Sequence, residues 1–226
     1  MTTRWKSLGV AAVALLGVGA WFGVPRLMAR LDYFRVRQIE VRGLRFLDEA
    51  DVVRRLALPD SASIVAPLGP LRDRAVLIPG VAGVSVERRL PGTLRVLILE
   101  ELPVALAMQE DRLVLIDRRG RVLPFDPTRA PTSLPVADRD STTAALLSAL
   151  LRADPAWYGT VESARREGGD IVLEEGAQRV RVRPDASLDV LRGITEVRAY
   201  LLSANRSWSE LDARFADRVF VKGGQS

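Results

Sequence analysis

Residues 84–103 read VSVERRLPGTLRVLILEELP, and this stretch decides the fold of the first third of the chain. Apolar and polar residues alternate before its central tetrapeptide LPGT, residues 90–93, and after it Leu94, Val96 and Ile98 fall on one face. Such alternation is typical of strands that bury one face. Pro followed by Gly at the two central positions of the tetrapeptide predicts a type II turn. The segment therefore predicts a β-hairpin with strands at 81–89 and 94–100.

The residues before this hairpin predict one more strand and two helices. Residues 36–42, VRQIEVR, alternate and predict a half-buried strand. Residues 48–56 place acidic side chains ahead of an apolar helical stripe, and residues 68–77 repeat a helical spacing that ends before Pro79. The order strand, helix, helix, strand, strand puts two helices on one face of a three-stranded sheet. It resembles a POTRA domain.

The character of the chain changes after Pro103, where a second, mixed α/β domain is expected. We expect helices at 141–151 and 188–202, and strands at 112–117, 121–123, 161–166, 171–173, 179–182, 210–215 and 218–222. The fold class is thus α+β, with a POTRA-like domain at 34–102, a β-rich domain at 103–222 and a short flexible tail at 223–226.

The N-terminal run LGVAAVALLGVGAWFGV, residues 8–24, contains no charge and is long enough to cross a bilayer at the short end of the usual range. We expect a transmembrane signal-anchor helix at 8–28 behind a cytoplasmic tail at 1–7. A cleaved signal peptide and a buried core helix are the alternatives. The residues expected in the bilayer include Leu8, Val13, Leu16, Trp21 and Val24.

Composition argues against most enzyme classes and against metal or cofactor sites. The chain has no His and no Cys, which removes the commonest general base, the commonest metal ligand and thiolate chemistry. Adjacent acids such as Glu100 and Glu101 face opposite sides of a strand and cannot converge on one substrate. The 33 Lys and Arg residues against 28 Asp and Glu are spread along the chain, so nucleic acid is not an expected partner.

The whole pattern resembles the FtsQ/DivIB family of bacterial cell-division proteins. The similarity lies in the opening strand FRVRQIEVRG at 34–43, in residues 84–103 and, more weakly, in ELDARFADRVFVK at 210–222. Membership would imply a non-enzymatic divisome scaffold in the cell inner membrane. It would span the membrane once, with its C-terminal region outside the cytoplasm at the division septum. The chain departs from the family in its short cytoplasmic tail and its short C-terminal extension.

The resemblance also implies partners, namely the single-pass proteins FtsB (DivIC) and FtsL, and a role in regulating septal cell-wall synthesis. The last predicted strand suits that role because a strand at a sheet edge offers backbone groups that another chain can pair with. We expect an FtsB-like strand to pair with Arg218, Val219, Phe220, Val221 and Lys222.

By resemblance, Phe215 matches an aromatic residue of the family's binding surface, and Arg214 and Arg166 match basic ones. The competing interpretation is that the arginines are merely solvated and that Phe215 and Phe220 are core residues. A different function also remains open, that of a POTRA-type chaperone or secretion adaptor that binds extended client peptides along the edge of its POTRA sheet.

Overall fold

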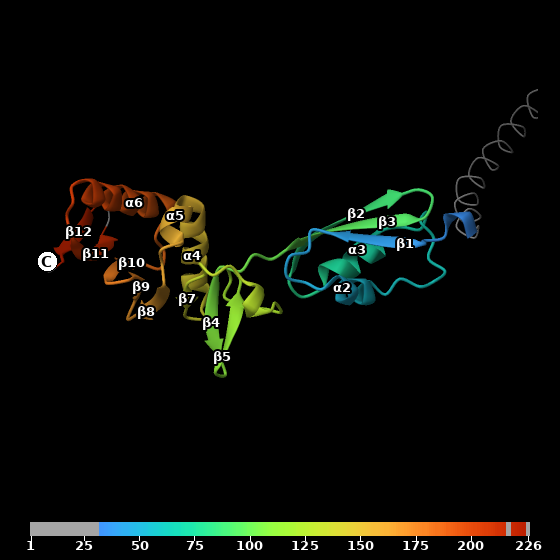
Figure 1. Cartoon of the computed structure of the whole chain (residues 1–226), viewed down its shortest axis with the longest axis horizontal. Helices are drawn as coiled ribbons and strands as arrows, with labels where there is room; N and C mark the ends of the chain where they lie inside the picture. Colours follow the sequence, from blue (N-terminus) through green and yellow to red (C-terminus); the bar gives the residue numbers. More distant parts are fainter. Residues whose placement is uncertain (1–31, 216–217, 225–226) are drawn as a thin grey trace, which may run out of the picture. The chain divides into compact units, whose positions relative to one another are not determined.

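The structure is a computed structural model that describes residues 32–215 and 218–224, and it divides into two compact units, Met1–Glu100 and Glu101–Ser226 (Figure 1). The expected membrane anchor lies outside the described residues. Among the residues that are described, no helix is long and apolar enough to cross a membrane.

The first unit has the predicted order of a strand, two helices and a hairpin. Its elements are η1 (Asp32–Phe34), β1 (Gln38–Arg42), α2 (Glu49–Leu56), α3 (Gly69–Val76), β2 (Val81–Arg89) and β3 (Thr93–Glu100). The sheet order is β1-β3-β2, with β1 parallel and β2 antiparallel to the central β3. Inward residues of β3, among them Leu94, Val96 and Ile98, form one core with Leu56 and Leu71 of the helices.

The turn between β2 and β3 differs from the prediction. The Leu90–Pro91 peptide is cis, and Gly92 does not have the positive φ that a type II turn requires at this position. The predicted type II turn is therefore wrong, whereas the hairpin itself is confirmed, with Arg89 paired to Thr93.

Gly43, which follows β1, occupies a position that only glycine fits. Its φ is +89°, and a Cβ added there would lie 2.1 Å from the backbone oxygen of Ile98. We expect Gly43→Ala to lower the free energy of unfolding of this unit by about 3 kcal/mol, since a left-handed backbone and a backbone clash both oppose it. Gly83→Ala is the matched control, because its Cβ would meet only the Leu99 side chain at 3.8 Å. Equal effects of the two changes in denaturant unfolding would refute this explanation.

The second unit is a nine-stranded sheet with helices packed on one face. Its elements are β4 (Ala105–Gln109), β5 (Arg112–Ile116), β6 (Val122–Leu123), η2 (Pro127–Arg129), β7 (Val136–Ala137), α4 (Ser141–Ala153), α5 (Pro155–Tyr158), β8 (Ser163–Glu167), β9 (Asp170–Glu175), β10 (Gln178–Val182), α6 (Leu188–Ser203), β11 (Trp208–Phe215) and β12 (Arg218–Gly223). The strand order is β12-β11-β10-β9-β8-β7-β4-β5-β6. Leu147, Leu150, Trp157, Leu191 and Ile194 of the helices form the core with the inward residues of the strands.

Local sequence explains where the helices of this unit begin. The Asp140 carboxylate accepts hydrogen bonds from the N–H groups of Thr142 and Thr143 at the start of α4. The Ser187 hydroxyl accepts one from Val190 at the start of α6. Capping of this kind satisfies N–H groups that the first helical turn leaves without a partner.

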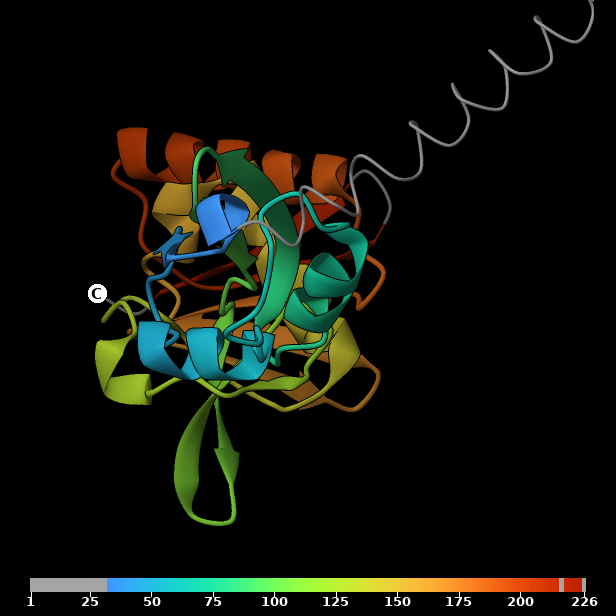
Figure 2. The same ribbon diagram turned by 90° about the vertical axis from the view of Figure 1, so that its right-hand side faces the viewer.

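The sequence did not predict β4, α5 or β7. The β4–β5 hairpin projects from the rest of its unit (Figures 1 and 2). At its tip Glu110 and Asp111 both have positive φ, at 48° and 61°. Asn and Gly usually occupy such positions, so this tip carries no recognisable turn sequence. The predicted hairpin around Gly120 is also present, and it joins β5 to β6.

Candidate partner-binding edge

β12 is the outermost strand at one end of the nine-stranded sheet. It runs antiparallel to β11, from the pair Phe215–Arg218 to the pair Trp208–Gly223, with two irregularities in the register. In the described part of the chain no strand pairs with its other side. The prediction of a terminal edge strand is therefore confirmed, and its outer backbone can accept another strand.

The side chains of β12 are mostly exposed, including Val221, which is 45% exposed on the face opposite Phe220. Phe220 pairs in register with Asp212, and Val221 pairs with the buried Leu211. Val219 packs against the core, whereas Arg218 and Lys222 are exposed. An incoming strand would therefore meet aromatic and basic groups on one face and valines on the other.

Phe215 and Phe220 form a surface pair rather than part of the core. Their ring centroids lie 5.2 Å apart in an edge-to-face arrangement, and the side chains are 51% and 53% exposed. The interpretation of these two residues as core aromatics is wrong. Two half-exposed aromatic rings in contact with each other, at the end of an open strand, are an apolar anchor of the kind that binding surfaces use.

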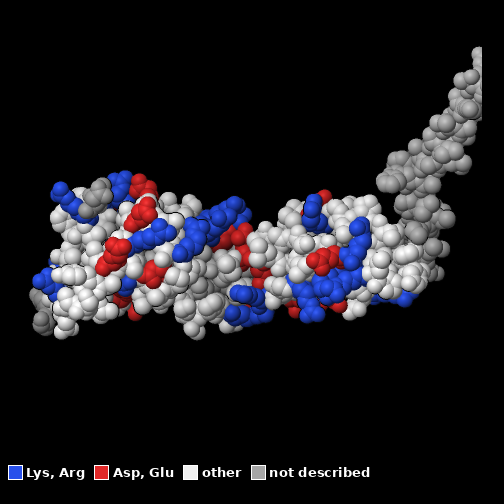
Figure 3. Space-filling view, turned by 90° about the horizontal axis from the view of Figure 1, so that it is seen from above, with Lys and Arg blue, Asp and Glu red and all other residues white. Residues whose placement is uncertain are grey.

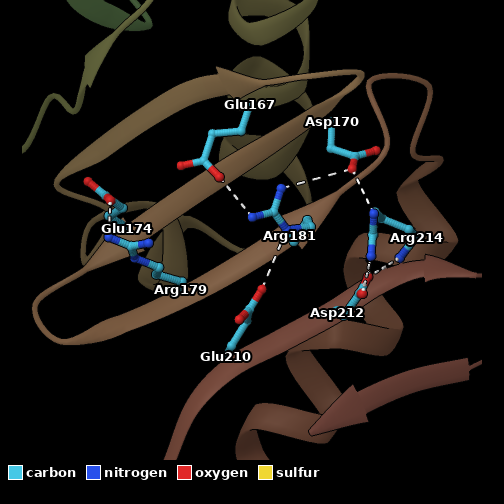
Figure 4. A network of polar contacts seen from close by, with 8 residues as sticks. All are labelled: Glu167, Asp170, Glu174, Arg179, Arg181, Glu210, Asp212 and Arg214. Carbon is cyan, nitrogen blue, oxygen red and sulfur yellow. Dashed lines mark hydrogen bonds and ion pairs between the residues drawn. The ribbon is translucent and has the colours of Figure 1, made fainter. Parts of the chain in front are cut away.

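Arg214 is held within the chain. Its guanidinium donates to Asp212 at 2.6 Å and to Asp170 at 3.0 Å, and it lies 5.7 Å from the Phe215 ring centroid (Figure 4). These carboxylates raise the pKa of Arg214. Both carboxylates that pair with Arg214 belong to this chain. Arg214 therefore holds Phe215 and the end of β11 in place rather than offering a free charge to a partner.

Arg214 is one end of a polar network that crosses the exposed face of the sheet. Arg181 on β10 donates to Glu167 on β8 at 2.8 Å and to Glu210 on β11 at 3.4 Å (Figure 4). Asp170 on β9 lies between Arg181 and Arg214 and contacts both. The network ties β11, which pairs with β12, to the next three strands of the sheet, because Arg181 contacts carboxylates from three strands and Asp170 bridges Arg181 and Arg214.

Arg166 does not belong to this edge. It lies on β8, and three strands separate it from β12 in the sheet order. At the usual spacing between strands this corresponds to about 19 Å. Its backbone N–H donates to Asp138 at 2.7 Å, and its guanidinium donates to Thr142 at 2.7 Å. The structure therefore does not bring Arg166 together with the other predicted contacts.

Sequence reasoning missed the residues that support the edge. Asp170, Arg181 and Asp212 stand in short strands whose charges look like ordinary solvated positions. The sequence does contain one useful signal. Arginines alternate with valines in residues 178–182, QRVRV, and the preceding segment 170–175, DIVLEE, carries acidic residues. Cross-strand pairs of opposite charge follow from that pattern once the hairpin register is known.

We expect the Arg214–Asp212 pair to make stability depend on pH. The hydrogen bond from Arg214 lowers the pKa of Asp212 below its ordinary value. A carboxyl group whose pKa is depressed by folding contributes stability above its unfolded pKa of about 3.9, and that contribution is lost as pH falls through the lower, folded pKa. The difference in unfolding free energy between the natural chain and Asp212→Asn should therefore be larger at neutral pH than in acid. A difference that does not change with pH would contradict this assignment.

Comparison with known proteins finds sequence similarity across both units. The family model described as POTRA domain, FtsQ-type, matches residues 34–101. A cell division protein FtsQ of Rhodothermus marinus is 30% identical over 95% of this chain and 84% of its own length. FtsQ of Novosphingobium aromaticivorans is 35% identical over 50% of this chain, and FtsQ of Mycobacteroides abscessus is 31% identical over 65%.

The extent of these matches differs between relatives. The matched region spans 38% of the Novosphingobium protein and 47% of the Mycobacteroides protein, less than half of each. The Rhodothermus protein, in contrast, is matched over most of its length and across both units of this chain. On that match, together with the POTRA domain of the first unit, the chain belongs to the FtsQ family of cell-division proteins.

Proposed function

We propose that this chain is a non-enzymatic scaffold of the divisome. In this proposal residues 8–28 anchor it in the cell inner membrane, with 1–7 in the cytoplasm and the domains 34–102 and 103–222 outside. Its relatives are cell division proteins, and this supports the general role. The uncharged run at 8–24 supports the anchor.

The observation that carries the proposal is the open outer side of β12. An FtsB- or DivIC-like partner would add a strand there, with backbone hydrogen bonds providing affinity and alternate side chains providing selectivity. FtsL would join through the same assembly, and the complex would recruit and regulate septal cell-wall synthesis. The exposed pair Phe215 and Phe220 would act as the anchor at one end of the added strand.

The charges along the edge suggest the chemistry of the partner strand. Arg218 and Lys222 are exposed, and in the described part of the chain neither forms an ion pair within 4.0 Å. Arg214, in contrast, is already paired with two carboxylates. We therefore expect acidic residues of the partner to face Arg218 and Lys222, and an apolar residue to face the two phenylalanines.

Co-purification of the full chain with an FtsB- or DivIC-like protein from the same cell tests this proposal. The natural chain should retain the partner, and a variant that lacks residues 217–226 should lose it. Binding of unrelated unfolded peptides by the same two proteins separates the scaffold from the chaperone alternative. Full retention of the partner by the shortened variant, or strong binding of many unrelated peptides, would contradict the proposal.

A further inference from the structure

The first unit carries a basic and apolar patch at the end where its chain enters. Because β1 and β3 are parallel, with Gln38 beside Thr93, the segments that precede these two strands meet at one end of the sheet. The N–H of Arg37 donates to the carbonyl of Gly92 at 2.8 Å, which fixes the two segments together. The exposed basic and large apolar side chains at this end are Tyr33, Arg35, Arg37, Arg88, Arg89 and Leu90, and we call them the hairpin-end patch.

The patch combines positive charge with projecting apolar groups. Leu90 is 68% exposed at the hairpin tip, and Tyr33 is 61% exposed. The Arg88 guanidinium is fixed by donation to the carbonyls of Ile64 and Ala66, at 2.7 and 2.8 Å, so no carboxylate neutralises it in these contacts. On the face of this unit that Figure 3 shows, the blue surface of Lys and Arg is more extensive than the red surface of Asp and Glu.

The acidic residues close to the patch are too few to cancel it. Glu87 precedes Arg88 on β2, and Asp60 lies in the loop that pairs with Arg35 through Ser63. Asp32 precedes Tyr33 in the sequence, and Glu40, which lies near Arg89, forms an ion pair with Arg95. Apart from that ion pair, three carboxylates stand against four arginines. The patch is therefore net positive and suits an anionic surface.

We infer that the hairpin-end patch rests on anionic lipid headgroups of the membrane that anchors the chain. The inference relies on the anchor of the proposed function, though not on the partner at β12. The apolar run ends at Val24, nine residues before Tyr33, a separation of at most about 30 Å even if fully extended. Arg26 and Arg30 add two positive charges to that connection.

Lipid is the occupant that fits this combination. Arginines attract anionic headgroups, while Leu and Tyr side chains enter the boundary between headgroups and acyl chains. The place where β3 ends at Glu100 and the chain continues lies at the opposite end of the same strands. Contact at the hairpin end would thus restrict how the unit tilts on its tether.

Site-specific fluorescence tests the inference, because the chain has no Cys of its own. Leu90→Cys in the full chain, labelled with a fluorophore, is reconstituted in nanodiscs that contain lipid with a spin label in the headgroup region. One set is made of phosphatidylglycerol with phosphatidylcholine and the other of phosphatidylcholine alone. Ala82→Cys, an exposed position near the other end of β2, is the position control.

The expected result is strong quenching of the label at position 90 in anionic nanodiscs and little at position 82. Arg37→Gln with Arg89→Gln should reduce the quenching at position 90 by about half or more. Arg72→Gln with Arg74→Gln, the same charge change on α3, should leave it unchanged. Equal quenching in neutral and anionic nanodiscs, or no excess over position 82, would overturn the inference, whatever the result of the partner experiment.

Discussion

Replacement of Phe215 and Phe220 by Ala together is expected to weaken binding of an FtsB- or DivIC-like partner by about a hundredfold. Truncation of an aromatic residue that anchors an interface costs about 2 kcal/mol or more, and each 1.4 kcal/mol is tenfold in affinity. The two rings touch, with centroids 5.2 Å apart, so their effects should not add fully. Calorimetric titration of the partner against each single variant and the double variant measures this loss and the coupling.

Tyr200→Ala is the matched control for that series. Tyr200 is also an exposed aromatic residue of the second unit, 61% exposed, but it lies on α6 and not on the edge strand. Its truncation should leave partner affinity unchanged. If the double Phe variant bound as tightly as the Tyr200 variant, the aromatic pair would have no part in recognition.

Glu100→Ala should destabilise the first unit by about 3 kcal/mol. The Glu100 side chain is buried at the end of β3, and its carboxylate accepts the backbone N–H groups of Arg45 at 2.9 Å, Phe46 at 3.0 Å and Leu47 at 2.8 Å. Loss of the carboxylate would leave these three donors without their acceptor, and a buried donor without a partner costs about 1–3 kcal/mol. The affected loop leads into Asp48, the N-cap of α2, so the helix should loosen as well.

Hydrogen exchange at the amides of residues 45–47 is the local measurement for this change. Exchange there should accelerate in Glu100→Ala. It should remain near normal in Glu87→Ala, the control, because Glu87 is an exposed acidic residue of the same sheet. Global unfolding in denaturant should show the same order. Normal protection of the three amides in Glu100→Ala would show that the loop is held by other contacts.

The sequence predicted the first unit better than the second because the patterns that define the elements of the first unit lie within short segments. Alternation and a proline-containing turn define the β2–β3 hairpin, and acidic residues before an apolar stripe define α2. The role of Glu100 could not be predicted, since its partners are more than fifty residues away and are backbone groups. Burial of a carboxylate is visible only once the loop that surrounds it is placed.

In the second unit the edge was predictable and its support was not. Phe220 and Val221 stand in an alternating segment, which predicted the strand that the structure places at the edge. The position of that strand beside β11, and the distance of Arg166 from it, follow from a strand order that no local pattern encodes. The internal pairing of Arg214 likewise depends on Asp170 from a strand that is not adjacent to it in the sequence.

Hydrogen exchange of β12 with and without the partner tests the central claim most directly. If an FtsB- or DivIC-like strand pairs with the open side of β12, amides within Arg218–Gly223 whose N–H groups point outward should become protected when the partner is added. Tight binding that leaves the exchange of these amides unchanged, with new protection elsewhere on the chain, would contradict recognition by strand addition.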